Sequence, residues 1–455
     1  MRVILAALAA IQWLTGCAVA EGSSPPVHAF VDVTVIRVYG EPALRHQTVL
    51  VRGDRIIAIG SARRTPLPEG AAVLGQPGQI IAPGLADMHV HIFNPDDGIL
   101  DLANGVTTVR NMSGRKDTNA LAADIDVGLT PGPKIYSSGP IIDGPGGIGG
   151  ATAATPAEIR GLIGSQAREG YIAAKLYENL SPDVFGEGVR AARSYGLQVY
   201  AHVPFSMSLD QVLALRIDSV EHLTGFDRAL APDAHGDWDE ERWANADIQG
   251  VDRLARAVAR SGVWNDATLV TLLDAPCAFA DIAAAEARPD YRYATARQRK
   301  LWRSQYEEVR GKRDPQAACA MSQRAHRVRL LMLRALVKAH APLLIGTDAP
   351  QPFVYPGLGF QEELSFHLDA GLTRAQILRI ASLDAARFLR REHEFGEVSV
   401  GGRADLLLLD HDPQAGFETL RDPAGVMAAG RWYDRATLSR LLGEVVERTG
   451  WHAAP

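Results

Sequence analysis

The stretch that decides the fold is Ile-Ile-Ala-Pro-Gly-Leu-Ala-Asp-Met-His-Val-His, residues 80–91. An apolar pair precedes the Pro-Gly step, and a short strand-like run then ends in His89-Val90-His91. Because alternate residues of a β-strand face the same side, His89 and His91 point together. Two imidazoles side by side at the end of a strand are a natural pair of metal ligands. An isolated His-x-His is equally consistent with two surface histidines near a turn, so the rest of the chain has to decide.

Length and composition predict a globular protein with more than one structural unit. The 455 residues exceed what one ordinary hydrophobic core holds, so we expect a large domain and a smaller one. The apolar fraction of 47% and the charged fraction of 22% are typical of soluble globular proteins. The formal net charge is −6 and no basic stripe stands out, which argues against a nucleic-acid partner.

Residues 1–22 have the pattern of a signal peptide. A basic residue is followed by an apolar run over residues 3–14, which is too short to span a bilayer. Leu-Thr-Gly-Cys, ending at Cys17, resembles a bacterial lipobox, in which the cysteine becomes the lipidated first residue. The alternative is ordinary cleavage near residue 18 or 20. We expect an exported protein, either periplasmic or anchored to the membrane of the cell envelope through Cys17.

The two remaining cysteines, Cys277 and Cys319, lie in one long segment that looks helical, residues 274–340. There is no Cys-x-x-Cys, so a thiolate zinc site is not supported. We expect the two thiols to stay unpaired, with a disulfide as the alternative that export would allow.

The two ends of the chain read as short strands. Residues 27–81 contain alternating runs joined by a Gly53-Asp54 turn, which predicts a hairpin. Further strand candidates lie between Phe395 and Tyr433. We expect residues 23–82 and 394–436 to build one small β-sandwich domain, followed by a C-terminal helix or tail over residues 437–455.

The central part, residues 83–393, alternates strand-like and helix-like segments, which predicts α/β architecture with a parallel sheet. Eight strands and this length favour a distorted (β/α)8 TIM barrel with insertions. An open doubly wound sheet is the alternative, but no Gly-x-Gly-x-x-Gly follows the first strand. The eight strand candidates are Leu85–His91, Val106–Asn111, Lys134–Ser138, Ile172–Tyr177, Leu197–His202, Ser219–His222, Thr268–Leu272 and Leu343–Thr347.

Chemically capable side chains follow the ends of several of these strands, where barrel enzymes carry their active sites. Taken singly, each has an ordinary explanation: a snorkelling lysine, core histidines or a helix-capping aspartate. Four imidazoles, one amine and one carboxylate at successive strand ends are together best explained by a metal site. These residues are His89, His91, Lys175, His202, His222 and Asp348.

With these motifs the chain resembles the amidohydrolase superfamily of metal-dependent hydrolases, and within it the prolidase-like and imidazolonepropionase-related branch. The resemblance runs from Val27 to about Tyr433. It rests on Pro-Gly-Leu-x-Asp-x-His-x-His at 83–91, Gly-Val-Thr-Thr-Val-Arg at 105–110, Gly-Thr-Asp at 346–348 and Gly-Arg-Ala-Asp-Leu at 402–406. It implies a distorted barrel joined to a two-part β-sandwich.

The resemblance also implies a pair of divalent metal ions, with Zn²⁺ as the expected metal. His89, His91 and Asp348 would bind one ion, and His202 and His222 the other. Lys175, carboxylated by CO2, would bridge them; without carboxylation the site would be mononuclear. The two ions would share a hydroxide that attacks a carbonyl, while Asp348 acts as general base and then as general acid.

The substrate is less constrained by the sequence. A glycine-rich loop over residues 139–150 is expected beside the barrel mouth. Prolidase-like relatives often carry a histidine in this loop, whereas this chain departs from them with Ile148. Tyr177 shares a strand face with Lys175, so it either hydrogen-bonds a substrate carbonyl or carboxylate or is a packed aromatic.

Three functions remain open from the sequence. The first is hydrolysis of an amide or peptide-like C–N bond in a small molecule, either a dipeptide or an N-acyl amino acid. The second is hydrolysis of a cyclic amide, a lactone or a phosphotriester. The third is an envelope lipoprotein that binds metal or ligand without turnover. We also expect a homo-oligomer.

Overall fold

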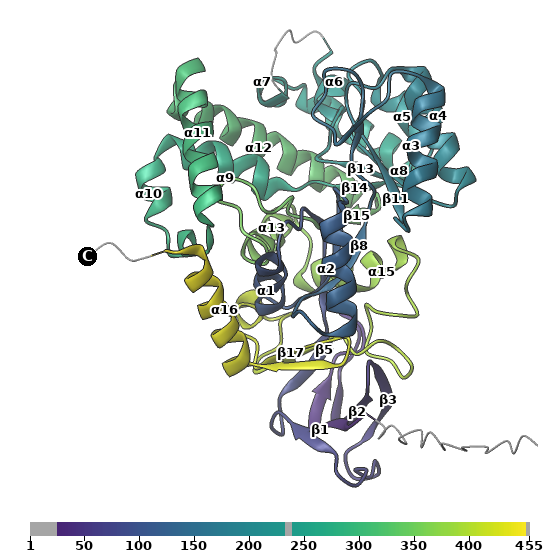
Figure 1. Ribbon diagram of the computed structural model, residues 1–455, viewed down its shortest axis with the longest axis vertical. Helices are drawn as coiled ribbons and strands as arrows, with labels where there is room; N and C mark the ends of the chain where they lie inside the picture. The colour runs from purple at the N-terminus through teal and green to yellow at the C-terminus, as the bar shows by residue number, and fades with distance from the viewer. Residues whose placement is uncertain (1–24, 233–238, 452–455) are drawn as a thin grey trace, which may run out of the picture.

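The computed structural model describes residues 25–232 and 239–451 (Figure 1). The expected signal peptide, residues 1–22 with Cys17, lies outside the described residues. In the described part of the chain, no helix is both long and apolar enough to cross a membrane.

Strands from both ends of the chain form one mixed sheet at the lower end of Figure 1. Its order is β18-β17-β16-β5-β1-β2-β3, with β4 beside β1. The sheet curls back on itself, since Ile56 N donates to Gly402 O at 3.0 Å and Ala404 N to Asp54 O at 2.8 Å. The strands are β1 (Val27–Val35), β2 (Leu44–Arg52), β3 (Arg55–Ser61), β4 (Ala72–Leu74), β5 (Ile80–Pro83), β16 (Leu406–Leu409), β17 (Gly425–Ala428) and β18 (Arg431–Asp434).

The hairpin predicted at Gly53-Asp54 is confirmed, because β2 and β3 pair antiparallel up to Arg52 opposite Arg55. Between the strands lies a separate apolar cluster, to which β1, β2, β5, β16 and β17 all contribute. The small β domain therefore closes around residues that are more than 300 positions apart in the sequence, such as Phe30 and Met427.

Eight parallel strands form the barrel predicted for the central part. They are β6 (Leu85–Val90), β7 (Val106–Asn111), β8 (Lys134–Ser137), β11 (Ala173–Leu176), β12 (Gln198–Ala201), β13 (Ser219–Glu221), β14 (Trp264–Asp266) and β15 (Leu343–Leu344). Regular pairing covers β6 to β8 and, separately, β11 to β15. Single parallel bridges, Ser138 with Ala173 and Val90 with Ala349, connect the two sets, so the barrel is distorted at both joints.

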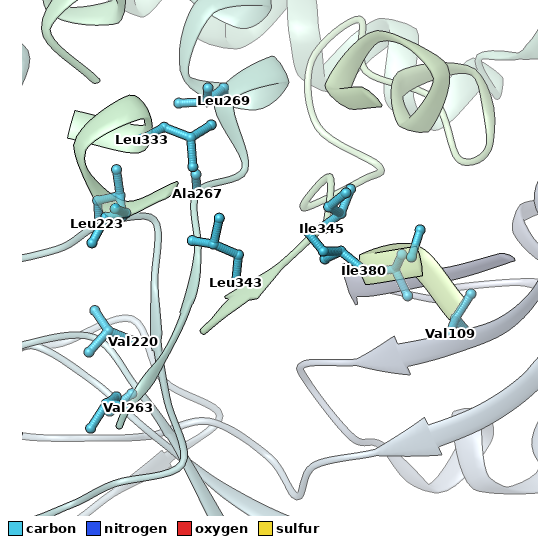
Figure 2. Close-up of a cluster of buried hydrophobic side chains, with 14 of the residues drawn as sticks. Val109, Val220, Leu223, Val263, Ala267, Leu269, Leu333, Leu343, Ile345 and Ile380 are labelled. Carbon is cyan, nitrogen blue, oxygen red and sulfur yellow. The ribbon is translucent and has the colours of Figure 1, made fainter. Parts of the chain in front are cut away.

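Helices surround the barrel and bury the outer faces of its strands. Figure 2 shows Leu223, Ala267 and Leu269 gathered against Leu333 of α12. The main outer helices are α1 (Pro95–Ala103), α2 (Lys116–Val127), α3 (Pro156–Arg168), α4 (Pro182–Ser194), α5 (Leu209–Ala214), α8 (Val251–Ser261), α12 (Pro315–Lys338) and α13 (Leu358–Asp369). These helices hold the strand ends rigidly, which the site requires.

The prediction for the seventh strand was wrong. Thr268–Leu272 is not a strand; the strand is β14, Trp264–Asp266, and the residues after Thr268 begin helix α9 (Leu269–Ala280). An apolar run of this length is too short to show whether its pattern repeats with the period of a strand or of a helix, so the sequence does not distinguish the two. The helix is favoured here because it packs along α12.

The segment between β14 and β15 is helical, as predicted, and comprises α9, α10 (Ile282–Glu286), α11 (Ala296–Lys312) and α12. The expectation of two unpaired thiols was wrong, because Cys277 of α9 and Cys319 of α12 form a disulfide with 4.5 Å between their Cα atoms. The cysteines are 42 residues apart in sequence, and only the packing of α9 on α12 brings them together.

Candidate metal centre

All six predicted site residues lie at one end of the barrel, at or just after the carboxyl ends of their strands. His89 lies in β6 and His91 directly follows it, while Lys175 lies in β11. His202, His222 and Asp348 come one to four residues after β12, β13 and β15. Parallel strands that start together end together, which is why residues 259 positions apart meet in one place.

The four imidazole rings form a chain across the barrel. Ring centroids are 5.6 Å apart for His89 and His91, 4.5 Å for His89 and His222, and 4.7 Å for His202 and His222. Asp348 closes one side of the group, because its Oδ1 lies 2.9 Å from His91 Nε2 and 3.4 Å from His89 Nε2. One ligand atom from each of His89, His91 and Asp348 lies within 4.8 Å of the others.

Three of the rings are anchored by the nitrogen that points away from the site. His89 Nδ1 lies 2.8 Å from Glu221 Oε2, and His222 Nδ1 lies 2.6 Å from Thr268 Oγ1. His202 Nδ1 lies 3.3 Å from Glu178 Oε1. A partner on Nδ1 fixes the ring and leaves Nε2 with its lone pair facing inward, which is the usual preparation of a metal-binding histidine.

The inward-facing atoms fit a metal. His89 Nε2, His202 Nε2 and Lys175 Nζ are buried and have no hydrogen-bond partner among the residues that the structure describes. Buried polar atoms without a partner are costly, so a group that binds them is expected. Imidazole nitrogens with one carboxylate suit Zn²⁺ and similar divalent ions. The donors of this centre therefore suit a divalent metal ion.

Burial and neighbouring charges set the protonation states of the centre. Burial lowers the pKa of His222 to about 3 and holds the pKa of His89 and His202 well below the ordinary value, so these rings are neutral ligands. Burial alone would raise the pKa of Asp348, but the facing histidines more than offset it and hold the pKa below its usual range. Burial also lowers the pKa of Lys175 to about 8, which makes the free amine more accessible for reaction with CO2.

The backbone at the site has unusual conformations. His222, Thr268 and Asp348 have φ of 58°, 44° and 63°, in the left-handed region that residues with a Cβ avoid. Gly346 lies so close to β6 that a Cβ there would meet His89 Cβ at 2.5 Å. A side chain at position 346 would therefore displace His89, which explains the glycine of the Gly-Thr-Asp motif.

A sequence model of the amidohydrolase family matches residues 80–433. The chain belongs to the amidohydrolase family. Among solved structures, bottromycin amidohydrolase is 25% identical, with a TM-score of 0.76 over 94% of this chain and 91% of that one. A Xaa-Pro dipeptidase with bound methionine is 16% identical, with a TM-score of 0.66 over 90% of this chain and 100% of that one, a likeness of fold alone.

A curated relative matches only in part. Adenine deaminase 2 of Bradyrhizobium sp. (strain ORS 278) is 36% identical over 75 residues, which are 16% of this chain and 12% of the deaminase. The family membership makes the protein a hydrolase of this superfamily acting on a small-molecule substrate, and the grouped histidines and Asp348 agree with the metal ions that such enzymes typically use.

A buried charge cluster beneath the centre was missed by sequence reasoning. Arg110, at the end of β7, donates to Glu221 Oε2 at 2.9 Å and to Asp266 Oδ2 at 3.2 Å, and all three side chains are fully buried. Arg110 also donates to Ser219 Oγ at 3.0 Å. The sequence does place a charged residue, Arg110, Glu221 or Asp266, at the end of each of three apolar strands. Asp266 was not recognised as such because the seventh strand was predicted at the wrong residues.

This cluster supports the centre and is not a second metal site. One ligand atom from each of His89, Glu221 and Asp266 lies within 4.8 Å of the others. However, the Arg110 guanidinium already occupies the position where a cation would neutralise the two carboxylates. The charge of Arg110 opposes the effect of burial and keeps the pKa of Glu221 below its ordinary value. Burial and the charge of Glu221 raise the pKa of Asp266 well above its own ordinary value.

Tyr177 lies beside the centre, as predicted from its place after Lys175. Its ring stacks on His202 at 3.9 Å between centroids, and Lys175 Nζ lies 5.6 Å from its centroid. Burial raises the pKa of its hydroxyl further above the ordinary value, so the hydroxyl is a neutral donor at working pH. The glycine-rich loop is organised by Asp143, which accepts from the backbone of Gly144 and Asn179 at 2.8 Å, while Ile148 points to solvent.

Two cavities adjoin the centre on different sides. One, of about 550 Å³, is lined by His222 together with Arg228, Phe205 and Trp243. The other, of about 950 Å³, is lined by Phe93 and the segment Pro350–Pro352, which continue from His91 and Asp348. A substrate bound at the metals can extend into either cavity.

Proposed function

We propose that the protein hydrolyses the amide or peptide-like C–N bond of a substrate that carries a free carboxylate, as a dipeptide or an N-acyl amino acid does. Membership of the amidohydrolase family supports hydrolysis. The carboxylate requirement is supported by one observation, the position of Arg228 in the cavity beside His222.

In this proposal His89, His91 and Asp348 would hold one divalent ion and His202 and His222 a second, Lys175 would serve both as a carboxylated ligand, and Zn²⁺ is the expected metal. When bound, such ions polarise a carbonyl oxygen and make a water molecule acidic near neutral pH. The anchored Nδ1 atoms of three histidines and the unpartnered Nζ of Lys175 support this assignment.

The protein's own groups handle protons and orientation. Asp348 is ionised at neutral pH because the histidines hold its pKa low, and its Oδ1 already contacts His91. We therefore assign Oδ2 of Asp348 to accept a proton from the attacking water and return it to the leaving amine. The neutral hydroxyl of Tyr177 is placed to donate to the substrate carbonyl.

Arg228 forms no ion pair in the described part of the chain, although its charge acts to lower the pKa of the neighbouring Glu178 carboxyl group. Its Nη2 donates to the carbonyl oxygens of Val203 and Pro204, both at 3.0 Å, and its guanidinium lies 5.6 Å from the Phe205 ring centroid. The acidic groups of the same cavity are matched by other arginines: Asp227 pairs with Arg242 at 2.6 Å and Glu240 with Arg329 at 2.7 Å.

The remaining positive charge favours an anionic substrate group. A guanidinium that already donates to two carbonyls is held in place, and its other N–H groups remain available to bind a carboxylate. Simple cyclic amides, lactones and phosphotriesters lack such a group, so they use this cavity less well.

The test compares matched substrates. The zinc-loaded protein is assayed for amine release from N-acetyl-leucine and leucyl-proline, and from their C-terminal amides. We expect hydrolysis of the free acids and a kcat/KM about 10- to 100-fold lower for the amides, since hydrogen bonds to charged groups contribute about 1.5–3 kcal/mol. Arg228→Gln should remove this preference. Arg256→Gln, an exposed arginine on α8, is the control that should retain it.

The proposal on carboxylate recognition fails if the amides are cleaved as fast as the acids. Hydrolysis of dihydrouracil or paraoxon, with none of the acids cleaved, would favour the second group of substrates instead.

We also propose that the protein is exported and anchored through Cys17. The Cys277–Cys319 disulfide supports an oxidising compartment. Fractionation of cells expressing the full chain and its Cys17→Ser variant is the test: the variant should move from the membrane to the soluble envelope fraction.

A further inference from the structure

The largest of the described cavities, about 950 Å³, does not lie over the histidines but beside them. Its walls come from five parts of the chain: the start of α1, the region around α2, α11, the segment Pro350–Pro352 and the C-terminal helix α16 (Arg435–Thr449). In Figure 1, α16 lies alongside α1 at the side of the barrel. No residue of this cavity has been assigned a role so far.

The cavity begins at the two loops that carry metal-centre residues. Phe93 lies two residues after His91, and their rings stack with centroids 6.2 Å apart and planes 13° apart. Pro350 lies two residues after Asp348. The loops are joined to each other, because His91 N donates to Ala349 O at 2.7 Å. Phe93 and Pro350 thus connect the metal centre at His91 and Asp348 to the wall of the cavity.

The lining combines polar residues with a group of large apolar side chains, and it is partly open to solvent. Phe93, Leu129 and Leu301 are 49%, 77% and 52% exposed, and all three line this cavity. Trp302 and Leu441 contribute buried apolar surface. Large apolar side chains that remain exposed around one hollow are typical of a binding site for an apolar group.

The walls are rigid, and most of their charges are already paired. Trp302 packs on Phe353 with 4.9 Å between ring centroids, which fixes α11 against the barrel. Arg448 of α16 pairs with Asp96 at 2.7 Å. Arg115 also pairs, with Asp117. Arg297 has no ion-pair partner in the described part of the chain, so a cationic ligand group is disfavoured here.

From these observations we propose that this cavity binds the acyl half of the substrate, and that the preferred substrates are amino acids N-acylated with a bulky, uncharged apolar group, aromatic groups included. The inference rests on the proposed function, because it places the carboxylate-bearing half of the same substrate at Arg228. The scissile bond then lies at the metal centre, between a polar cavity and an apolar one.

The experiment measures the ratio of kcat/KM between a substrate with a bulky apolar acyl group and one with a small acyl group. The kcat/KM of the zinc-loaded protein is compared for N-phenylacetyl-leucine and N-acetyl-leucine, two amides that differ by one phenyl group. Burying one aromatic group favours the larger substrate, and we expect a ratio of about 10 to 100. Leu301→Asp places a charge in the cavity wall from an exposed position on α11 and should lower this ratio at least about tenfold. Leu331→Asp, at a 38% exposed position on α12 away from the cavity, should not lower it.

A binding measurement tests the cavity separately from the hydrolytic reaction. Calorimetry with the metal-free protein and N-phenylacetyl-leucine should give an affinity about tenfold weaker for Leu301→Asp than for the wild type and the Leu331→Asp control. If neither substrate is cleaved but this difference is found, the proposed reaction fails and the apolar site stands. If the ratio is near 1 and the three proteins bind the probe equally, the apolar site is refuted even when both substrates are cleaved.

Discussion

Replacing Arg110 with methionine tests whether the buried charge cluster supports the metal centre. Methionine fills similar space and keeps contact with Tyr200 and Phe388, whose ring centroids lie 4.5 and 5.0 Å from the guanidinium carbon. What is lost is the charge and its bonds to Glu221, Asp266, Ser219 and the carbonyl oxygen of Met88.

The expected loss of stability in the variant depends on which of the two carboxyl groups remains charged without Arg110. Burial and Glu221 raise the pKa of Asp266 well above its ordinary value, which favours its neutral form, so the loss of a charged partner falls mainly on Glu221. Breaking a buried ion pair by removing one member costs about 3–5 kcal/mol. We expect the free energy of unfolding to fall by that amount and Tm to fall by about 3–5 °C.

The effect should depend on pH with a defined sign. In the wild type Arg110 opposes burial and keeps the pKa of Glu221 low. In the variant the largest opposing cause is gone and only Lys175, Ser219 and His222 still act against burial, so the folded-state pKa of Glu221 is expected to rise from its wild-type position toward and above the unfolded value. A group of this kind stabilises below its unfolded pKa and loses that contribution as pH rises through the folded pKa. The stability gap between variant and wild type should therefore be larger at pH 8 than at pH 5.

The assay is thermal and urea unfolding of the metal-free proteins at the two pH values. Arg387→Met is the matched control, because its partner Asp384 lies 2.8 Å away on the surface and such pairs contribute at most about 1 kcal/mol. Zinc titration adds a second readout: loss of the Arg110 contact loosens Glu221 and hence His89, so zinc affinity should fall about 10- to 100-fold. Equal Tm values for Arg110→Met and the control would refute the assigned role.

Three further outcomes are expected. Thr268→Val removes the hydroxyl beside His222 Nδ1 and should weaken zinc binding about tenfold with little change in Tm of the metal-free protein, measured by zinc titration; unchanged affinity would contradict the anchoring role. Replacing both Cys277 and Cys319 with serine opens a 42-residue loop and should lower the unfolding free energy by about 4 kcal/mol, and dithiothreitol should lower the wild-type Tm but not that of the variant. Asp348→Asn should abolish turnover while keeping much of the metal, measured as metal per chain; normal turnover would remove Asp348 from proton transfer.

The outline of the site was predictable from sequence because its ligands follow apolar strands. His89, His91, Lys175, His202 and Asp348 each come at the end of a run that reads as a buried strand, and parallel strands place their ends at one rim. The pairing of the two chain ends was likewise predictable, since both consist of short alternating runs that need a partner to cover their apolar faces.

Tertiary structure alone decided what surrounds those ligands. Arg110 had no visible partner in the sequence, because Glu221 and Asp266 lie 111 and 156 positions away and meet it only when the barrel closes. The seventh strand and the disulfide depended on how α9 packs along α12, which a short apolar run does not reveal. The apolar cavity is built from segments as distant as Phe93 and Leu441, so only the fold brings its walls together. Local patterns reveal which residues are buried and in which direction they face, whereas a cavity or a buried ion pair is a relation between segments and exists only after they pack.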